Sequence, residues 1–124
     1  MTEWEGGDTH RMSTRDTLQS FYNSLKPQKE WESFLADEMM FISNGKHIQG
    51  KEASIEGIRR FYSMVQSLEV KELLIEGEKA SAIIRYVLQS PKGQTFSSDV
   101  AEFFTVKNGQ FVSFAIYFDS APYP

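Results

Sequence analysis

The sequence contains no cysteine, which excludes disulfide bonds and thiolate chemistry from this protein. Its two histidines, His10 and His47, are too few to favour a histidine-based metal site, and we predict neither a metal nor a cofactor. No apolar stretch approaches the roughly 20 residues that a membrane-spanning helix needs. Because the N-terminus also has no signal-peptide pattern, we expect a cytoplasmic protein that does not associate with membranes.

Positive charge is scarce as well. The formal net charge is −4, and the longest basic run is the pair Arg59-Arg60. Proteins that bind nucleic acid neutralise several phosphates with clustered lysine and arginine side chains. The sequence therefore disfavours nucleic acid as a partner.

Aromatic residues are plentiful by contrast. Ten Phe, five Tyr and two Trp make up 14% of the 124 residues, and 40% of the residues are hydrophobic. A chain of this length is about the size of one domain. Aromatic rings fill cores, but they also line pockets for small molecules.

The first twelve residues differ from the rest of the chain. Residues 1–12 are polar, contain Gly6-Gly7 and show no periodicity, so we predict a flexible N-terminal arm, with Met12 as an alternative start. Residues 13–124 alternate between helical and strand patterns without a linker or a repeat. We predict that they form a single domain.

Three segments have helical spacing. A helix beginning near Ser13 carries apolar residues three and four positions apart until Pro27 ends it. A short second helical segment covers residues 31–35, and a longer helix is predicted over residues 51–66.

The rest of the pattern indicates strands. One strand is predicted at residues 38–43, before a turn at Asn44-Gly45, which leaves His47 in a loop. Four more are predicted at residues 70–76, 79–89, 95–107 and 110–119. Long strands joined by turns indicate an antiparallel meander, and helices gathered on one side of it give an α+β domain.

The turn between the last two strands, at residues 107–109, can be formed in two ways. A two-residue turn pairs Val106 with Phe111 and puts the apolar sides of the two strands on opposite faces. A three-residue loop pairs Val106 with Gln110 and gives one continuous apolar face. We predict the three-residue loop, which keeps Glu102 on that continuous face.

Glu102 is then a carboxyl among apolar neighbours. Such a group must find a cation or take up a proton. Arg85 is the candidate cation, because a four-residue turn at residues 91–94 makes it a diagonal neighbour of Glu102. Alternation leaves open which side of this strand faces inward, since the alternate residues, starting at Ala82, are at least as apolar.

Several short strings occur in a familiar order. They are Phe21-Tyr22, residues 34–38, residues 50–53, residues 106–111 and Tyr117-Phe118-Asp119. In this order they resemble the nuclear transport factor 2-like superfamily, and within it the SnoaL-like domain, over about residues 14–119.

The resemblance implies a cone-shaped, cystatin-like α+β fold, in which a curved antiparallel sheet packs on three helices around an apolar pocket. It also implies a homodimer through the outer face of the sheet, where Phe103, Ala115 and Tyr117 are the candidate contact residues. Similar proteins include ketosteroid isomerases, limonene epoxide hydrolases, polyketide cyclases, dehydratases and non-enzymatic binding domains.

Ketosteroid isomerase positions transfer only in part. Its general base falls on Ser43, which cannot act as one, so this activity is not predicted. Its oxyanion-hole tyrosine falls on Phe21, next to Tyr22. Its protonated oxyanion-hole acid falls on Glu102, a conservative match.

Limonene epoxide hydrolase positions transfer less well. The arginine falls on Arg85, and the resemblance thereby implies that Arg85 faces inward. The two aspartates fall on Val87 and Ile116, which leaves no group to activate water there. The resemblance does not predict this activity either.

The predicted pocket thus contains one candidate catalytic residue, Glu102, and two polar ligand-binding residues, Arg85 and Tyr22. Its apolar wall is predicted to consist of residues for which simple core packing is the alternative: Phe21, Trp31, Phe41, Phe61, Val87, Phe104, Phe114, Ile116 and Phe118.

We therefore predict a domain that binds a small apolar ligand bearing a polar oxygen, which contacts Arg85, Glu102 and Tyr22. The first alternative is a SnoaL-type cyclase, isomerase or dehydratase that uses Glu102 as general acid and base. The second is a dimeric protein-interaction module whose pocket is vestigial.

Overall fold

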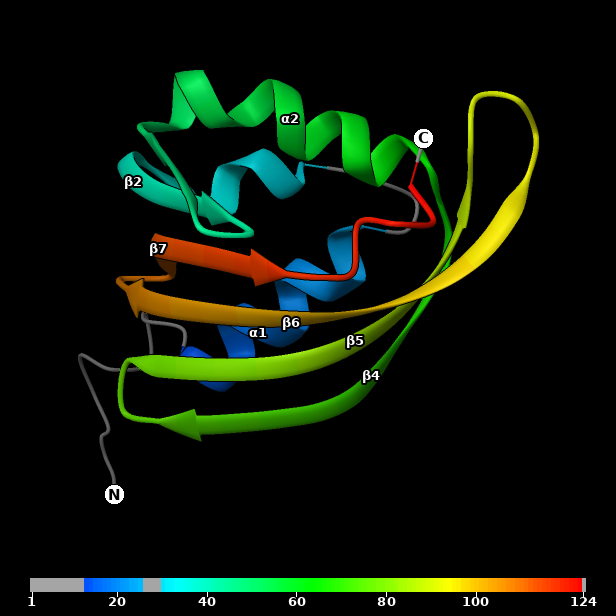
Figure 1. Ribbon diagram of the computed structural model, residues 1–124. Helices are drawn as coiled ribbons and strands as arrows, with labels where there is room; N and C mark the ends of the chain where they lie inside the picture. The colour runs from blue at the N-terminus through cyan, green and yellow to red at the C-terminus, as the bar shows by residue number, and fades with distance from the viewer. Residues whose placement is uncertain (1–12, 26–29, 124) are drawn as a thin grey trace.

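The computed structural model describes residues 13–25 and 30–123. The predicted arm at residues 1–12 and the helix-ending Pro27 lie outside the described residues. None of the described helices is long and apolar enough to cross a membrane. The elements, in chain order, are α1 (Thr14–Ser24), the 3-10 helix η2 (Trp31–Phe34), β2 (Leu35–Ser43), β3 (Lys46–Gln49), α2 (Lys51–Ser63), β4 (Val65–Glu76), β5 (Lys79–Gln89), β6 (Thr95–Lys107) and β7 (Gln110–Tyr117) (Figure 1).

The first helix begins and packs as its sequence predicts. The Ser13 side chain caps it by accepting a 3.0 Å hydrogen bond from the backbone N–H of Asp16. The buried residues Leu18, Phe21 and Tyr22 follow the three- and four-residue spacing of one helix face. This face places Tyr22 toward the interior of the fold.

Several element boundaries differ from the prediction. α2 ends at Ser63 rather than at residue 66, because Val65 already pairs with Leu88 in the sheet. β2 begins at Leu35, and β7 ends at Tyr117. β3 was not predicted, since its four residues include only one that is partly buried, and it places His47 in a strand.

The six strands form one sheet in the order β3-β2-β7-β6-β5-β4. The α+β class and the curved sheet are confirmed, but the sheet is mixed, because β2 and β7 run parallel with Phe41 opposite Phe114. Sequence alternation cannot reveal this pairing, since no hairpin joins the two strands. The helices number two α-helices and one short 3-10 helix among the described residues, where three helices were predicted.

The sheet curls around the helices. Figure 1 shows β4, β5 and β6 bending together, and α2 connecting the two edge strands, β3 and β4. Rings from both helices meet on the inner side, where Phe21 of α1 and Tyr62 of α2 have centroids 6.2 Å apart. The concave face is therefore the one that the helices cover.

The turn between β6 and β7 is the shorter of the two alternatives. Lys107 pairs with Gln110, which leaves Asn108 and Gly109 as a two-residue loop. Their φ angles of 53° and 76° are the positive values that a type I′ turn requires. The predicted three-residue loop is wrong.

A β-bulge at Val112 nevertheless preserves the continuous apolar face. The ladder passes from the pair Val106–Phe111 to the pair Thr105–Ser113, and Val112 is left without an opposite residue. The extra residue offsets the side-chain alternation by one position. Beyond the bulge, the apolar residues of β6 and β7 therefore share the inner side.

The side of β5 that faces inward is the opposite of the side that the resemblance implies. The last pair of the β5–β6 hairpin is Gln89–Thr95, so the loop contains five residues instead of four. The additional residue pairs Arg85 with Asp99 and moves Arg85 to the outer face. The inner side of β5 consists of Ala80, Ala82, Ile84, Tyr86 and Leu88, all of them buried.

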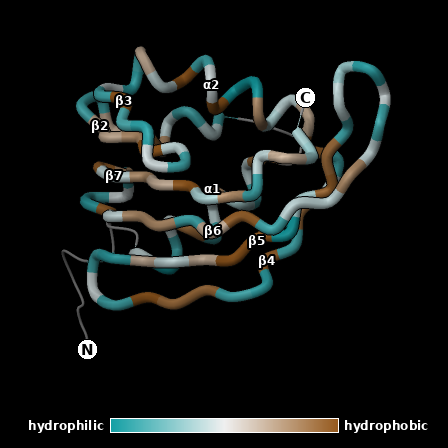
Figure 2. Tube along the Cα trace, in the orientation of Figure 1, coloured by the Kyte–Doolittle hydropathy of each residue, from teal (hydrophilic) through white to brown (hydrophobic). Residues whose placement is uncertain are grey.

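Aromatic rings form the centre of the core. Phe21 packs edge-on against Phe111 with ring centroids 4.8 Å apart, and Phe104 stacks on Phe114 at 4.7 Å. Figure 2 shows that the loop joining β5 to β6 is largely hydrophilic, whereas hydrophobic residues recur along the long strands. The buried apolar residues of the helices and of the inner side of the sheet form one core cluster.

Candidate functional site

A cavity of about 290 Å³ lies between α2 and the inner sides of β2, β6 and β7. Pockets for small organic molecules begin at roughly 300 Å³, so this cavity suits a ligand of one or two rings. The cavity is lined by Phe41, Ser43, Lys46, Ile48, Gly57, Ile58, Arg60, Phe61, Tyr62, Val100, Glu102, Phe114, Ile116 and Phe118.

Glu102 is the acid of this cavity. Strand alternation in β6 turns it to the inner side together with Val100 and Phe104, and it is only 1% exposed. Its neighbours across the ladder are Ala82 on β5 and Ile116 on β7. Both are apolar, so the carboxyl depends on residues from other positions for hydrogen bonds.

Two tyrosines supply these hydrogen bonds. The Tyr22 hydroxyl, from α1, donates to Oε1 of Glu102 at 2.5 Å. The Tyr86 hydroxyl, from β5, donates to Oε2 at 2.7 Å. Each carboxyl oxygen therefore has one donor, and both donors come from buried side chains.

Burial dominates the ionisation of Glu102. Desolvation raises its pKa from 4.5 to about 7, although the hydrogen bonds from Tyr22 and Tyr86 lower it in part. No lysine or arginine forms an ion pair with this carboxyl among the described residues. Near neutral pH, both its protonated and its ionised form are therefore present.

Tyr86 and Tyr62 belong to the site but were not predicted as site residues. Burial raises the pKa of both phenols well above 10, and the nearby Glu102 adds to the shift. In the sequence, Tyr62 lies on the apolar stripe of its helix, where it looks like core. Tyr86 lies on the side of β5 that the wrong register turned outward. The feature of the sequence that could identify these two residues is a tyrosine at an inward-facing position near a buried carboxyl that lacks a cation.

The arrangement can bind and exchange a proton. Protonated Glu102 can donate a hydrogen bond to a ligand oxygen, and ionised Glu102 can accept one or take up a proton. Among the described residues that line the cavity, Glu102 is the one carboxylate, and none is a histidine. No group of three or more His, Asp or Glu residues that could hold a metal occurs within residues 13–25 and 30–123.

Most of the predicted apolar wall lies around the cavity. Phe41, Phe61, Phe114, Ile116 and Phe118 line it, as the sequence predicts. These side chains come from β2, α2, β7 and the segment after β7. The apolar wall thus combines segments that lie far apart in the sequence.

Three other predicted wall residues lie in the packed core instead. Phe21 and Phe104 contact the rings of Phe111 and Phe114, and Trp31 packs edge-on against Tyr62 at 5.2 Å. They are all at most 3% exposed. They do not line the cavity but pack against residues that do, such as Tyr62 and Phe114.

The prediction that Arg85 pairs with Glu102 and points into the pocket is wrong. Arg85 donates to Asp99 from Nε at 2.8 Å and from a terminal guanidinium nitrogen at 3.2 Å, on the exposed outer face. Val87, two residues further along the strand, shares this outer face and does not line the cavity either. Both errors follow from the single extra residue in the β5–β6 loop.

Comparisons with known proteins identify the family. The family model of the SnoaL-like domain matches residues 4–114. No curated protein matches this chain. The matched segment includes most of β7 and every element before it.

Solved structures share the fold. A nuclear transport factor 2-like protein of unknown function from Burkholderia pseudomallei is 17% identical with a TM-score of 0.73, and the alignment covers 90% of this chain and 95% of the other. A proposed SnoaL-like polyketide cyclase from Jannaschia is 14% identical with a TM-score of 0.74, covering 93% and 91%. TerC, co-crystallised with polyporic acid, is 12% identical with a TM-score of 0.72, covering 89% and 94%.

At such low identities the structural likeness concerns the fold alone. The match to the family model extends over most of the chain, and the curved sheet, the covering helices and the cavity between them agree with it. This chain therefore belongs to the family of SnoaL-like domains and has the nuclear transport factor 2-like fold.

Proposed function

We propose that this protein binds a small apolar molecule in the cavity and that a polar oxygen of this molecule lies against Glu102. The observation that carries the proposal is a carboxyl held by two tyrosines at the inner end of a cavity whose walls are largely apolar. An interaction module with a vestigial pocket would have this space filled by side chains. The unfilled volume of about 290 Å³ argues against that alternative.

Glu102 gives the site its selectivity. A hydroxyl or carbonyl oxygen beside the carboxyl gains a hydrogen bond, which contributes about 1 kcal/mol when neutral and about 2 kcal/mol when charged. A purely apolar ligand of the same shape leaves the carboxyl without this partner. The oxygenated ligand should therefore bind about tenfold more tightly than its hydrocarbon counterpart.

Naphthol and naphthalene form a suitable test pair, because they differ by one hydroxyl. We expect calorimetry to show tighter binding of naphthol to the full chain. Replacing Ile116 by Trp fills the cavity and should abolish binding. Replacing the neighbouring Tyr117 by Trp adds the same ring on the outer face and should leave binding intact.

Two results would contradict the proposal. One is equal affinity of naphthol and naphthalene for the unaltered protein. The other is undiminished binding of naphthol by Ile116→Trp, which would place the ligand outside this cavity.

Proton transfer by Glu102 is the second candidate function. The observation that favours it is the pKa of about 7, which suits a group that both gives and takes a proton near neutral pH. β-Tetralone, an apolar ketone with acidic C–H bonds, is a convenient probe. An active site of this kind should accelerate exchange of those hydrogens for deuterium from the solvent, as followed by NMR.

Variants separate catalysis from binding. Glu102→Gln keeps the shape of the side chain but removes the titrating proton, so exchange should stop while naphthol still binds. Tyr117→Phe, on the outer face, is the matched control and should retain full exchange. Absence of saturable exchange in the unaltered protein would rule out this activity for this ketone and leave binding as the proposed function.

A further inference from the structure

Two cations line the same cavity as Glu102. Lys46 lies at the start of β3, and Arg60 lies in the last turn of α2. Both residues are exposed, whereas Glu102 is 1% exposed. The ionisable acid and the cations of the cavity are thus separated, with Glu102 at the inner end and Lys46 and Arg60 at the solvent end.

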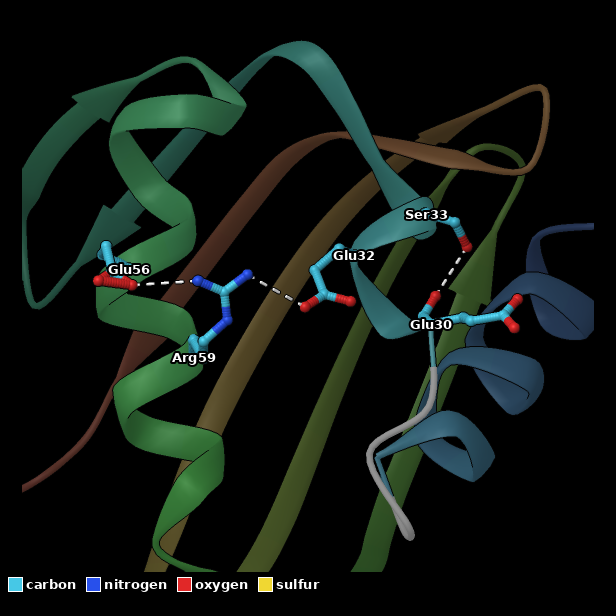
Figure 3. A network of polar contacts seen from close by, with 5 residues as sticks. All are labelled: Glu30, Glu32, Ser33, Glu56 and Arg59. Carbon is cyan, nitrogen blue, oxygen red and sulfur yellow. Dashed lines mark hydrogen bonds and ion pairs between the residues drawn. The ribbon is translucent and has the colours of Figure 1, made fainter.

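The adjacent residues Arg59 and Arg60 differ in their partners, because among the described residues Arg59 forms surface ion pairs and Arg60 does not. Arg59 donates to Glu56 on its own helix at 3.1 Å and to Glu32 of η2 at 3.3 Å (Figure 3). Arg60 points to a different side of α2, toward the cavity. Within the described part of the chain, no carboxylate lies at ion-pair distance from Arg60 or Lys46.

We infer that the ligand of this cavity is an organic acid, whose carboxylate lies between Lys46 and Arg60 while its other polar oxygen reaches Glu102. This inference rests on the proposed function and names the class of molecule that the site accepts. The apolar walls between the two polar ends would contact the hydrocarbon part of the ligand.

The order of charges fixes the orientation of the ligand. A carboxylate placed at the inner end would meet the buried Glu102 carboxyl, and two carboxyl groups in an apolar site repel when both are ionised. The same group at the solvent end meets two cations and keeps part of its hydration. The ligand should therefore enter with its uncharged oxygen first.

The cations at the solvent end should contribute modestly, because exposed charge pairs are weakened by water and salt. We expect each cation to strengthen binding of a carboxylate about threefold, and both together about tenfold. This contribution should shrink as the salt concentration rises, whereas the contribution of the apolar walls should not.

The experiment uses para-hydroxycinnamate and its uncharged amide, para-hydroxycinnamamide, with the full chain. Both carry a phenolic hydroxyl at one end and differ in charge at the other. Calorimetry or ligand-observed NMR should show about tenfold tighter binding of the acid at low salt. Arg60→Gln and Lys46→Gln should each weaken binding of the acid and leave the amide unaffected.

Arg59→Gln is the matched control, since it removes the same charge from the adjacent position of α2. It should leave the acid's affinity unchanged. Equal affinities for acid and amide, or equal losses in Arg59→Gln and Arg60→Gln, would overturn the inference.

Naphthol separates this inference from the proposed function. Binding of naphthol without tighter binding of para-hydroxycinnamate overturns the organic-acid inference alone. If naphthol also fails to bind, the proposed function has failed too.

Discussion

Tyr22 and Glu102 are 80 positions apart in the chain, yet the Tyr22 hydroxyl donates a 2.5 Å hydrogen bond to Oε1 of Glu102. The contact joins the first helix to the middle of β6. With Tyr86 on the other oxygen, it holds the carboxyl in one orientation at the cavity. The site therefore depends on α1 being docked, even though α1 contributes no residue to the cavity wall.

Tyr22→Phe should raise the pKa of Glu102 above its value of about 7. The lost hydrogen bond stabilises the ionised carboxylate, so its removal favours the protonated form. Carbon NMR titration of the glutamate carboxyl groups would measure the change. Tyr117→Phe, with its ring on the opposite face of the sheet from the carboxyl, should leave it unaltered. A lowered pKa in Tyr22→Phe would contradict the assigned hydrogen bond.

Glu102 should make the protein less stable as the pH rises. Its folded pKa of about 7 lies above its ordinary value of 4.5, so the folded state holds the proton more tightly than the unfolded state between these values. The stabilisation is therefore fully present below about pH 4.5 and is lost by about pH 7, a change of about 3 kcal/mol from this group.

Urea unfolding at several pH values, compared between the unaltered protein and Glu102→Gln, isolates this contribution. Because glutamine does not titrate, the stability of the unaltered protein relative to the variant should decrease by about 3 kcal/mol from about pH 4.5 to about pH 7. A pH-independent difference would show that Glu102 titrates alike in the folded and unfolded chains.

Arg85→Gln tests the outward placement of this arginine. The hydrogen bond and charge of Arg85 hold the pKa of Asp99 below its ordinary value, so the variant should raise the Asp99 pKa. Glu102 has no contact with Arg85, and its pKa and the affinity for naphthol should not change. A changed pKa of Glu102 in this variant would instead indicate that Arg85 faces inward.

Tyr123 should control access to the cavity. Its ring lies 4.7 Å from that of Phe118 and 6.3 Å from that of Phe61, both cavity residues, and its hydroxyl donates to Ser98 at 2.7 Å. Removing the ring should loosen this side of the wall, so Tyr123→Ala should release bound ligand faster. Tyr123→Phe keeps the ring contacts and should change the dissociation rate much less. Stopped-flow displacement of naphthol compares the two rates.

The homodimer through the outer face of the sheet stays a prediction. Phe103 and Tyr117 are 46% and 42% exposed there, with ring centroids 5.9 Å apart, and Leu74 is 67% exposed. If a second copy covers these residues, Phe103→Glu should convert a dimer to a monomer in sedimentation velocity. Phe103→Leu keeps the surface apolar and should remain dimeric. A monomeric unaltered protein would refute the prediction.

The inward placement of Glu102 could be predicted because it depends on β6 alone. Val100, Phe104 and Val106 alternate on the same side of that strand, so any pairing that buries them also buries Glu102. The turn type did not matter for this residue. The β-bulge at Val112, and not a longer loop, gives β6 and β7 their continuous apolar face.

The face of Arg85 could not be predicted, because it depends on the length of a loop. Both sides of β5 carry apolar residues, so alternation gives no preference. One additional loop residue, Ser90, exchanges the two sides. The sequence therefore predicts the cation Arg85 as the partner of Glu102 from β5, whereas the actual partner from this strand is Tyr86. The parallel pairing of β2 with β7 was missed for a similar reason, since nothing local in the sequence records it.

That parallel pairing also bears on biosynthesis. β2 leaves the ribosome long before β7, so Phe41 must wait for Phe114 until almost all of the described fold has been made. Contacts between such distant segments slow folding and expose apolar surface in the meantime. A nascent chain that lacks β7 would expose the inner side of β2 to solvent, and shielding by chaperones during this interval would protect it from aggregation.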